Sequence, residues 1–535
     1  MSRDNFDYDY VIVGSGFGGS VSALRLAEKG WRVAVVEQGR KIGPAEISRA
    51  KNSMRKLLWL PQLGFKGFFA QHVFTHLVAL GGVGVGGGSL VWGAVMLEPR
   101  DNFYNDPATT DLGVDWRSEL APHLRKAAQM LGVTRNPRQS EQDSLLHKTA
   151  ERMGVGETHA SVPNAIFFGS GRSTVAGATV ADPYFQGQGP ERVPCRFCGG
   201  CLTGCEYGSK NSLDYNYLYL AQRKGVEIIA ERRADRIEPL PGGGYRLTLV
   251  STSGRVIQTL TSQKLVLSAG VVGTINLLLR NRDQYQTLPA LSATLGRVVR
   301  TNSEAITAVL HPSGADMSDG TAISSDFHPD GKTHATQNRF DRGYRFMRIY
   351  MGPMVDGTHR LRRSLQTLAS IVLHPKLLFA NLFSRDWEKR LTVFTVMQDV
   401  ENHLSLQLHR PWWNGFRLTL VSRIKSALAP PSYLPVANRV AREFASISGG
   451  TPMNTVLESV FAKCTTAHIL SGCPMGASSD TSAIDIHHQV HGYDGLYVVD
   501  GSSIPANVGV NPSLTIAAMA ERFAAYQPGR NETEG

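Results

Sequence analysis

The sequence lacks the features that mark membrane-spanning and secreted proteins. No uncharged apolar stretch reaches the roughly 18–20 residues that a membrane-spanning helix needs. Residues 1–8 are short, polar and acidic, whereas a secretory signal has a basic start and an apolar stretch before its cleavage site. We therefore expect a cytoplasmic protein.

Two further classes of protein find little support. Lys and Arg outnumber Asp and Glu by 56 to 45, a net charge of +11, but no basic run or aromatic ladder accompanies this excess. We therefore expect no nucleic-acid partner. Only six cysteines are present, and four of them crowd between Cys195 and Cys205, a poor arrangement for ordinary disulfides. This crowding favours a reducing compartment, again the cytoplasm.

Length and glycine content indicate how the chain is organised. At 535 residues it exceeds one ordinary core, so two or three interleaved domains are expected. The composition is 42% hydrophobic and 19% charged, which is typical of a globular protein. The 54 glycines indicate many tight turns or close backbone approaches.

The N-terminal segment has the order of a βαβ unit. Residues 10–13 are a short apolar run of strand-forming side chains, and residues 20–29 carry apolar side chains at helical spacing. Residues 31–36 form a second strand pattern, which ends at Glu37. A parallel strand pair joined by a short helix is the simplest fold for this order.

The glycine turn in this unit predicts a dinucleotide site. Gly14 permits the tight turn, Gly16 lets the backbone approach a pyrophosphate, and Gly19 lets helix and strand pack closely. The helix N-terminus offers free N–H groups to the phosphates. Glu37, 18 residues after Gly19, can accept hydrogen bonds from ribose hydroxyls. The alternative is an ordinary glycine turn, but the order of strand, helix, strand and carboxylate argues against it.

Four further segments indicate which dinucleotide to expect. They are the glycine run at residues 81–93, the leucine-rich residues 266–279, residues 468–476 and residues 500–513. With the N-terminal unit they resemble the glucose–methanol–choline (GMC) family of FAD oxidoreductases, in its cholesterol-oxidase-like branch. The resemblance covers most of the chain and is weakest over residues 310–460. It implies that the cofactor is FAD.

The resemblance also implies the fold. It predicts an α/β protein (α+β overall) with a Rossmann-type FAD-binding domain built from discontinuous segments. A substrate-binding cap domain floored by a β-sheet would lie over the flavin. The ranges expected are 7–100, 191–300 and 464–528 for the FAD-binding domain, 101–190 and 301–463 for the cap and substrate-binding parts, and 529–535 for a flexible tail.

Small and acidic residues are expected around the flavin on the same grounds. Longer side chains in the second glycine run would collide with the ring, so the residues expected against it are Gly86, Gly87, Gly88 and Ser89. The resemblance places Asp500, beside Gly501 at a strand end, near the ribityl chain and phosphates. A helix or turn cap is an alternative role for Asp500.

The expected reaction follows from the resemblance as well. It implies an FAD-dependent oxidoreductase that acts on the CH–OH or ketone-adjacent carbons of a sterol- or steroid-like substrate, by hydride transfer to flavin N5. His468 matches the histidine that faces the substrate hydroxyl, and Asn511 the asparagine that completes the pair beside the flavin. An imidazole suits this position because it can donate and accept near neutral pH. The alternative for His468 is a buried histidine without a catalytic role.

Two positions leave parts of this reaction open. Sterol-oxidising relatives often carry an asparagine near the position of Trp92, so the electron acceptor is expected to be either oxygen or a redox partner. Glu304 is the candidate for the extra acid/base carboxylate of sterol oxidases, with a surface or structural role as the alternative. Three other activities stay open: a 3-ketosteroid desaturase or dehydrogenase with a non-oxygen acceptor, a flavin-containing lyase without redox turnover, and a non-catalytic flavin protein.

The crowded cysteines have the spacing of a ferredoxin ligand run. Cys195, Cys198, Cys201 and Cys205 are separated by two, two and three residues. This spacing raises the hypothesis of an iron–sulfur cluster. Glu206 rather than proline follows the last cysteine, and no second run is present. Zinc and a glycine-rich connection with reduced thiols are the alternatives.

Two segments combine bulky apolar residues with basic ones. They are residues 54–69, with Arg55, Lys56 and Lys66, and residues 360–390, whose bases include Arg360 and Lys376. Interfacial segments have this composition because an apolar face enters the lipid while basic groups meet anionic headgroups. We therefore expect that at least one is a lid that makes peripheral contact with the inner membrane face. The alternative is that both pack in the core as caps.

Overall fold

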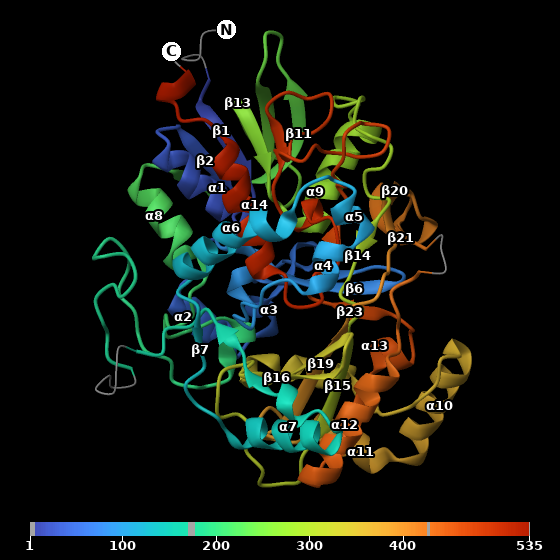
Figure 1. Cartoon of the computed structure of the whole chain (residues 1–535). Helices are drawn as coiled ribbons and strands as arrows, with labels where there is room; N and C mark the ends of the chain where they lie inside the picture. The colour runs from blue at the N-terminus through green and yellow to red at the C-terminus, as the bar shows by residue number, and fades with distance from the viewer. Residues whose placement is uncertain (1–5, 170–176, 425–427, 534–535) are drawn as a thin grey trace.

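The computed structural model describes residues 6–169, 177–424 and 428–533. Residues 1–5 and 534–535, which belong to the N-terminal segment and the tail considered above, lie outside this description. Within it, two seven-stranded sheets organise the chain, one near each end of the molecule in Figure 1. A smaller five-stranded sheet lies between them.

The first large sheet contains the predicted βαβ unit. Its parallel strands are buried almost throughout because helices cover them, among them α1 (Phe17–Glu28) and α14 (Ser513–Tyr526), which pack on each other. The sheet joins distant segments, as the family resemblance implied. Its order is β10 (Glu227–Ile229), β2 (Val33–Val36), β1 (Tyr8–Val13), β13 (Val256–Leu267), β12 (Tyr245–Val250) and β11 (Arg233–Pro239), with β25 (Leu496–Val498) also paired to β13.

The second large sheet is antiparallel and carries helices on one face. Phe394 and Val396 of β19 pack there against Phe444 of α12 (Pro435–Ser448), and α7 (Glu141–Arg152) lies beside it. The opposite face includes Val393. The order is β18 (Met351–Pro353), β22 (Thr451–Thr455), β15 (Ala305–Leu310), β19 (Leu391–Gln398), β17 (Thr333–Asn338), β16 (Ser325–Asp330) and β8 (Ala160–Ser161). This sheet matches the predicted floor of a substrate domain.

The five-stranded sheet joins the two halves of the molecule. Its strand β23 (Cys464–Thr466) pairs in parallel with β6 (Leu77–Gly82) and lies next to β15 of the second sheet. The remaining strands are β5 (Phe69–Val73), β3 (Leu58–Leu60) and β4 (Phe65–Lys66). The fold class is therefore confirmed, while the exact domain boundaries stay a prediction.

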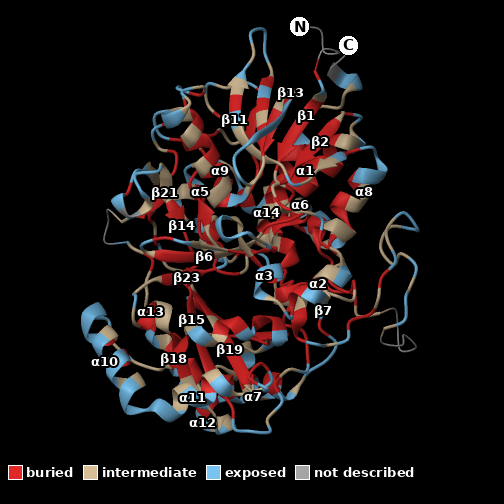
Figure 2. Cartoon of the chain, turned by 180° about the vertical axis from the view of Figure 1, so that it is seen from behind, coloured by how far each residue is buried: buried red, intermediate tan, exposed pale blue. Residues whose placement is uncertain are grey.

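The two segments expected to be lids differ in how far they are buried. Residues 54–69 enter the five-stranded sheet, where Leu57, Leu58, Phe68 and Phe69 are buried, as the core-packed alternative expects, while Met54 and Leu63 stay exposed. Peripheral membrane contact by either segment stays a prediction. The second segment forms α10 (Arg360–Leu373) and α11 (Pro375–Phe383), which are largely exposed at one edge in Figure 2. No helix in the described part of the chain is long and apolar enough to cross a membrane.

Candidate active site

The first glycine loop has the geometry that its sequence predicts. Gly14 has φ +101°, and a Cβ there would lie 2.2 Å from the Ser268 carbonyl oxygen. A Cβ on Gly19 would lie 2.0 Å from the Gly14 carbonyl oxygen, so only glycine lets α1 begin this close to the strand. At Gly16 a Cβ would meet no protein atom within 4 Å. The protein therefore leaves no space for a side chain at Gly14 or Gly19, whereas Gly16 faces open space.

The second glycine run completes a backbone cradle against this loop. Gly87 has φ +54°, and a Cβ there would lie 2.7 Å from the Gly16 Cα, whereas one at Gly88 would meet nothing within 4 Å. The Gly86 N–H donates to Ser15 Oγ over 3.1 Å. Ser89 is buried and holds the turn from within, because its hydroxyl donates to the Gly86 carbonyl and accepts from the Leu213 N–H.

Glu37 ties the loop to its surroundings. Its Oε2 accepts from both the N–H and the hydroxyl of Ser15, at 3.1 and 2.7 Å, and its Oε1 accepts from the Gly39 N–H at 2.8 Å. Burial raises the pKa of this carboxyl, while these hydrogen bonds oppose the rise. A carboxylate oxygen can accept about two hydrogen bonds. Oε1 therefore keeps acceptor capacity for a ribose hydroxyl.

Asp500 acts as a cap, the alternative considered for it, and its place near the ribityl chain and phosphates stays a prediction. Its Oδ1 accepts from the N–H and hydroxyl of Ser502, and its Oδ2 accepts from the Gly270 N–H and the Thr274 hydroxyl. Burial raises the pKa of the Asp500 carboxyl. It therefore fixes the start of α9 (Gly270–Leu279) to the turn at Gly501.

Three residues predicted from separate segments meet at one point. His468 Nδ1 lies 2.5 Å from Glu304 Oε1, and His468 Nε2 lies 3.1 Å from Asn511 Nδ2. Glu304 is 1% exposed, which excludes the surface role considered for it. Because the imidazole is held from both sides, its orientation is fixed before any substrate arrives.

The carboxylate of Glu304 is itself held in place. Its Oε1 accepts from the Thr466 hydroxyl at 3.1 Å, and its Oε2 accepts from the Ala467 N–H at 3.0 Å. The His468 N–H donates to the Thr466 hydroxyl at 2.9 Å. Strand β23 therefore ends in a turn that positions carboxylate and imidazole together.

A second buried carboxyl lies close to this group. Burial raises the pKa of Glu458 to about 8, and repulsion from Glu304 adds to the rise. The hydrogen bond from the Ile306 N–H and the charge of Arg363 lower this pKa but do not offset the rise. A carboxyl of this kind is largely uncharged at neutral pH.

These surroundings fit a flavin dinucleotide. Gly16 and Gly88 leave backbone facing open space where any side chain would intrude. Among the described residues, the buried Asn511 Oδ1 and Trp92 Nε1 have no hydrogen-bond partner, and a buried polar atom without a partner is costly. The Trp92 ring packs 4.9 Å from that of Phe17, at the start of α1, so it lies beside the loop. The residues present thus match the cofactor expected from sequence.

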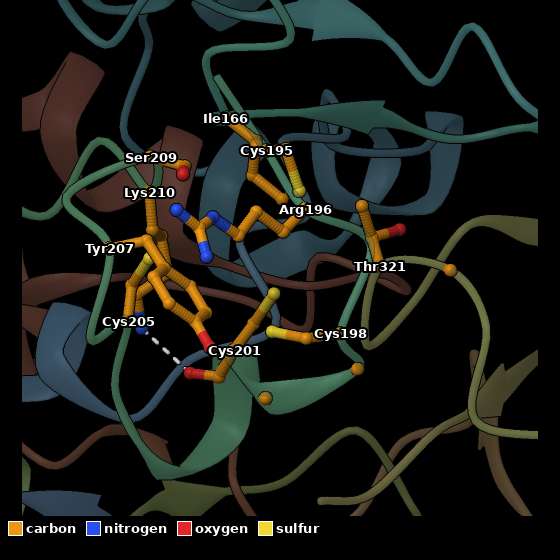
Figure 3. Close-up of a pocket in the computed structure, with 13 residues that line it drawn as sticks. Ile166, Cys195, Arg196, Cys198, Cys201, Cys205, Tyr207, Ser209, Lys210 and Thr321 are labelled. Atoms are coloured by element: carbon orange, nitrogen blue, oxygen red, sulfur yellow. Dashed lines mark hydrogen bonds between the residues drawn. The ribbon is translucent and has the colours of Figure 1, made fainter. Parts of the chain in front are cut away.

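The four clustered cysteines line one small pocket, together with Arg196 and Lys210 (Figure 3). Lys210 donates to the Cys201 carbonyl oxygen over 2.7 Å, as the dashed line in Figure 3 marks. All four are free thiols. Within residues 6–169, 177–424 and 428–533, no three His, Cys, Asp or Glu side chains are arranged to hold a metal ion. The iron–sulfur hypothesis for Cys195, Cys198, Cys201 and Cys205 therefore gains no support.

Sequence reasoning missed several residues of the site. Thr466 stands two positions before His468, and this proximity was the available signal. Ser15 lies inside the glycine fingerprint and could have been paired with Glu37. Glu458 had no signal, because nothing in its local sequence separates it from a surface glutamate.

Comparisons with known proteins agree with this geometry. A family model described as GMC oxidoreductase matches residues 413–520, and one for an NAD(P)-binding Rossmann-like domain matches residues 12–76. A cholesterol oxidase of Mycobacterium tuberculosis (strain ATCC 25618 / H37Rv) is 39% identical over 99% of this chain and 92% of its own length. A cholesterol oxidase of Acinetobacter baumannii is 36% identical over 100% and 97%.

A solved structure resembles the whole chain. It is that of pyridoxine 4-oxidase from Mesorbium loti, with a TM-score of 0.60, 15% sequence identity and coverage of 97% of this chain and 98% of that one. At this identity the likeness concerns the fold alone. It agrees with the two large sheets described above.

Proposed function

Because the chain belongs to the GMC oxidoreductase family and is an FAD-dependent oxidoreductase, we propose that it oxidises the hydroxyl-bearing carbon of a sterol- or steroid-like apolar substrate. The relatives from M. tuberculosis and A. baumannii, both named cholesterol oxidases, support this substrate class. A long-chain-alcohol oxidase of Arabidopsis thaliana is similar at only 24% identity, which favours a sterol over an acyclic alcohol.

The observation that carries the proposal is the chain of contacts from Glu304 through His468 to Asn511. A carboxylate on Nδ1 keeps the proton of a neutral imidazole on that nitrogen, so Nε2 is the nitrogen that can accept. Nε2 then takes the proton of the substrate hydroxyl as the carbon is oxidised. Glu304 stabilises the imidazolium that results. Asn511 Nδ2 contacts Nε2 at 3.1 Å in this structure, and we propose that it donates to the reacting oxygen once the substrate hydroxyl takes its place at Nε2.

FAD would be held by the two glycine runs and Glu37, and when bound it supplies the group that accepts the hydride from the carbinol carbon. The work of the protein is to orient the hydroxyl and to remove its proton at His468 Nε2. We propose oxygen as the electron acceptor, on the support of the relatives named oxidases. We also propose that the enzyme works in the cytoplasm, at the inner membrane face.

The test is anaerobic addition of sterols to purified protein, read by flavin absorbance. We expect a 3-hydroxysterol to bleach the flavin bands, and readmitted air to restore them with release of peroxide. Bleaching by long-chain alcohols but by no sterol would overturn the substrate class. Reoxidation only by an added carrier would overturn oxygen as the acceptor. Cell fractionation followed by detection of the protein tests its location.

A further inference from the structure

Helix α10 has its apolar side chains on the wrong face for a helix packed in a core. Leu361, Leu365, Leu368 and Val372 follow the helical repeat on one face, and each is 49–76% exposed. The opposite, buried face carries Arg363 and Thr367. A helix that buries polar groups and exposes leucines is built to meet something apolar.

Helix α11 continues this surface. Phe379 and Phe383, one turn apart, stack at 5.5 Å and are 60% and 71% exposed. Leu373, at the end of α10, is 71% exposed. We call these residues, with the four of α10, the docking hairpin; it projects at the lower right of Figure 1.

The docking hairpin is anchored, so its exposure is not loose packing. The Arg363 guanidinium donates to the Glu458 carbonyl oxygen at 2.7 Å and to the Ser432 hydroxyl at 3.0 Å. The Ser364 hydroxyl donates to the Val460 carbonyl oxygen at 2.7 Å. These contacts fix α10 with its apolar face outward.

Charge on the hairpin has one sign only. Residues 357–385 contain no Asp or Glu, and the exposed bases among them are Arg360, Arg362, Lys376 and Arg385. A second protein copy could cover leucines, but it would offer the same bases, and like charges repel. An anionic lipid surface satisfies both features, because acyl chains receive the leucines and headgroup phosphates meet the bases.

A small apolar cavity lies beneath the hairpin, against the edge of the second sheet. Ile371, Leu377 and Leu378 line it from the hairpin, and Met351 and Met453 line it from β18 and β22. Met453 also belongs to the core cluster that contains Val393 of β19. The apolar lining therefore runs from the hairpin to the sheet predicted to floor the substrate site.

We propose that the docking hairpin inserts its exposed leucines and phenylalanines into the surface of an anionic phospholipid membrane. Docking at this surface stands independently of the reaction. The further step, entry of an apolar substrate from the lipid past the cavity under the hairpin, rests on the proposed function.

The test is co-sedimentation of the full holoenzyme with vesicles at low salt. We expect binding to phosphatidylcholine–phosphatidylglycerol vesicles and much weaker binding to phosphatidylcholine alone. The triple variant L365S/V372S/F379S should lower the partition coefficient about tenfold or more, and the charge variant R362E/K376E should remove the preference for anionic lipid. Val256→Ser, an equally exposed apolar residue on β13 near the other end of the molecule, is the matched control and should bind normally.

Flavin content and two turnover measurements distinguish lost membrane docking from lost folding or lost catalysis. Flavin content should be unchanged in the triple variant, and so should turnover of a detergent-dispersed sterol, while turnover of a vesicle-borne sterol should fall. Equal binding by the unmodified protein and the triple variant would overturn the proposal, as would no binding by either. Loss of a dimer in light scattering by the triple variant, without vesicle binding by the parent, would assign the face to a second copy instead. If vesicles bind but no sterol turns over, docking stands and the proposed function fails.

Discussion

The glycine loop and the catalytic group are built in opposite ways. Gly14, Gly16 and Gly19 lie within six consecutive residues and act through backbone shape alone. Glu304, His468 and Asn511 come from three separated segments and act through side-chain atoms that meet only in the folded chain. Changes in the loop should therefore act on folding and cofactor retention, and changes in the group should act on turnover.

The largest effects expected are within the loop, where two glycines should fail differently. Gly19→Val forces a Cβ to within 2.0 Å of a backbone oxygen, so we expect little folded protein. At Gly16 an added Cβ meets no protein atom within 4 Å, so from Gly16→Val we expect a folded chain that has lost its yellow colour. Circular dichroism and flavin absorbance measure the two outcomes. Gly331→Val, at another open glycine, is the control, and a Gly16 variant with full flavin content would refute our assignment of the loop.

His468→Ala should give the opposite pattern, a flavin-loaded protein with little activity. Loss of a positioned acid–base group typically costs on the order of 10²–10⁴ in rate, and Asn511→Ala should fall in the lower part of that range. Anaerobic flavin reduction in stopped flow measures the step directly. Normal rates in both variants would remove the pair from the mechanism.

Glu304→Gln should have a smaller effect than His468→Ala, because the imidazole remains in place. We expect a loss on the order of 10² in the rate of flavin reduction, since the charge that stabilises the imidazolium is gone. Thr466→Val, which removes only a hydrogen bond to Glu304, serves as the milder comparison. A Gln variant with the parent rate would leave Glu304 a structural role.

Glu458 should affect stability rather than turnover. Its pKa is raised from 4.5 to about 8 in the folded chain, so between these values the folded state holds a proton that the unfolded state has lost. The stability it contributes is therefore present below about pH 4.5 and is lost as pH rises through about 8. Glu458→Gln should flatten the fall in unfolding free energy over this interval. Denaturant unfolding at several pH values measures it, and an unchanged slope would contradict the assignment.

The smallest effect concerns the four clustered cysteines. Their ferredoxin-like spacing did not give an arrangement that could hold a metal ion. We expect protein prepared without air to contain iron and sulfide well below one cluster per chain, because no three of the described side chains are arranged around a metal. Elemental and sulfide analysis checks this. A stoichiometric content of both would mean that the segment rearranges around a cluster and would revive the hypothesis.

Features that depend on neighbouring residues could be predicted from the sequence, and features that depend on distant residues could not. The βαβ unit, the glycine geometry and helix α14 were predictable because each depends on neighbours in the chain. His468 and Asn511 were found only through family resemblance, and the contact of Glu304 with His468 could not be derived, because 164 residues separate the two. Segments 54–69 and 360–390 had similar composition, yet the first buries Leu57, Phe68 and Phe69 while the leucines of the second are exposed, because composition does not say which face of a helix or sheet finds a partner.

The position of β25 has a consequence for how this protein is made. β25 pairs with β13 in the sheet that contains β1, and α14, which follows it, packs on α1. A ribosome needs roughly 25–100 s, at about 5–20 residues per second, to pass from Val13 to Leu496. During this time the apolar surface of the first strands and of α1 lacks its final neighbours. The nascent chain should therefore depend on chaperones, and stable flavin incorporation should follow translation rather than accompany it.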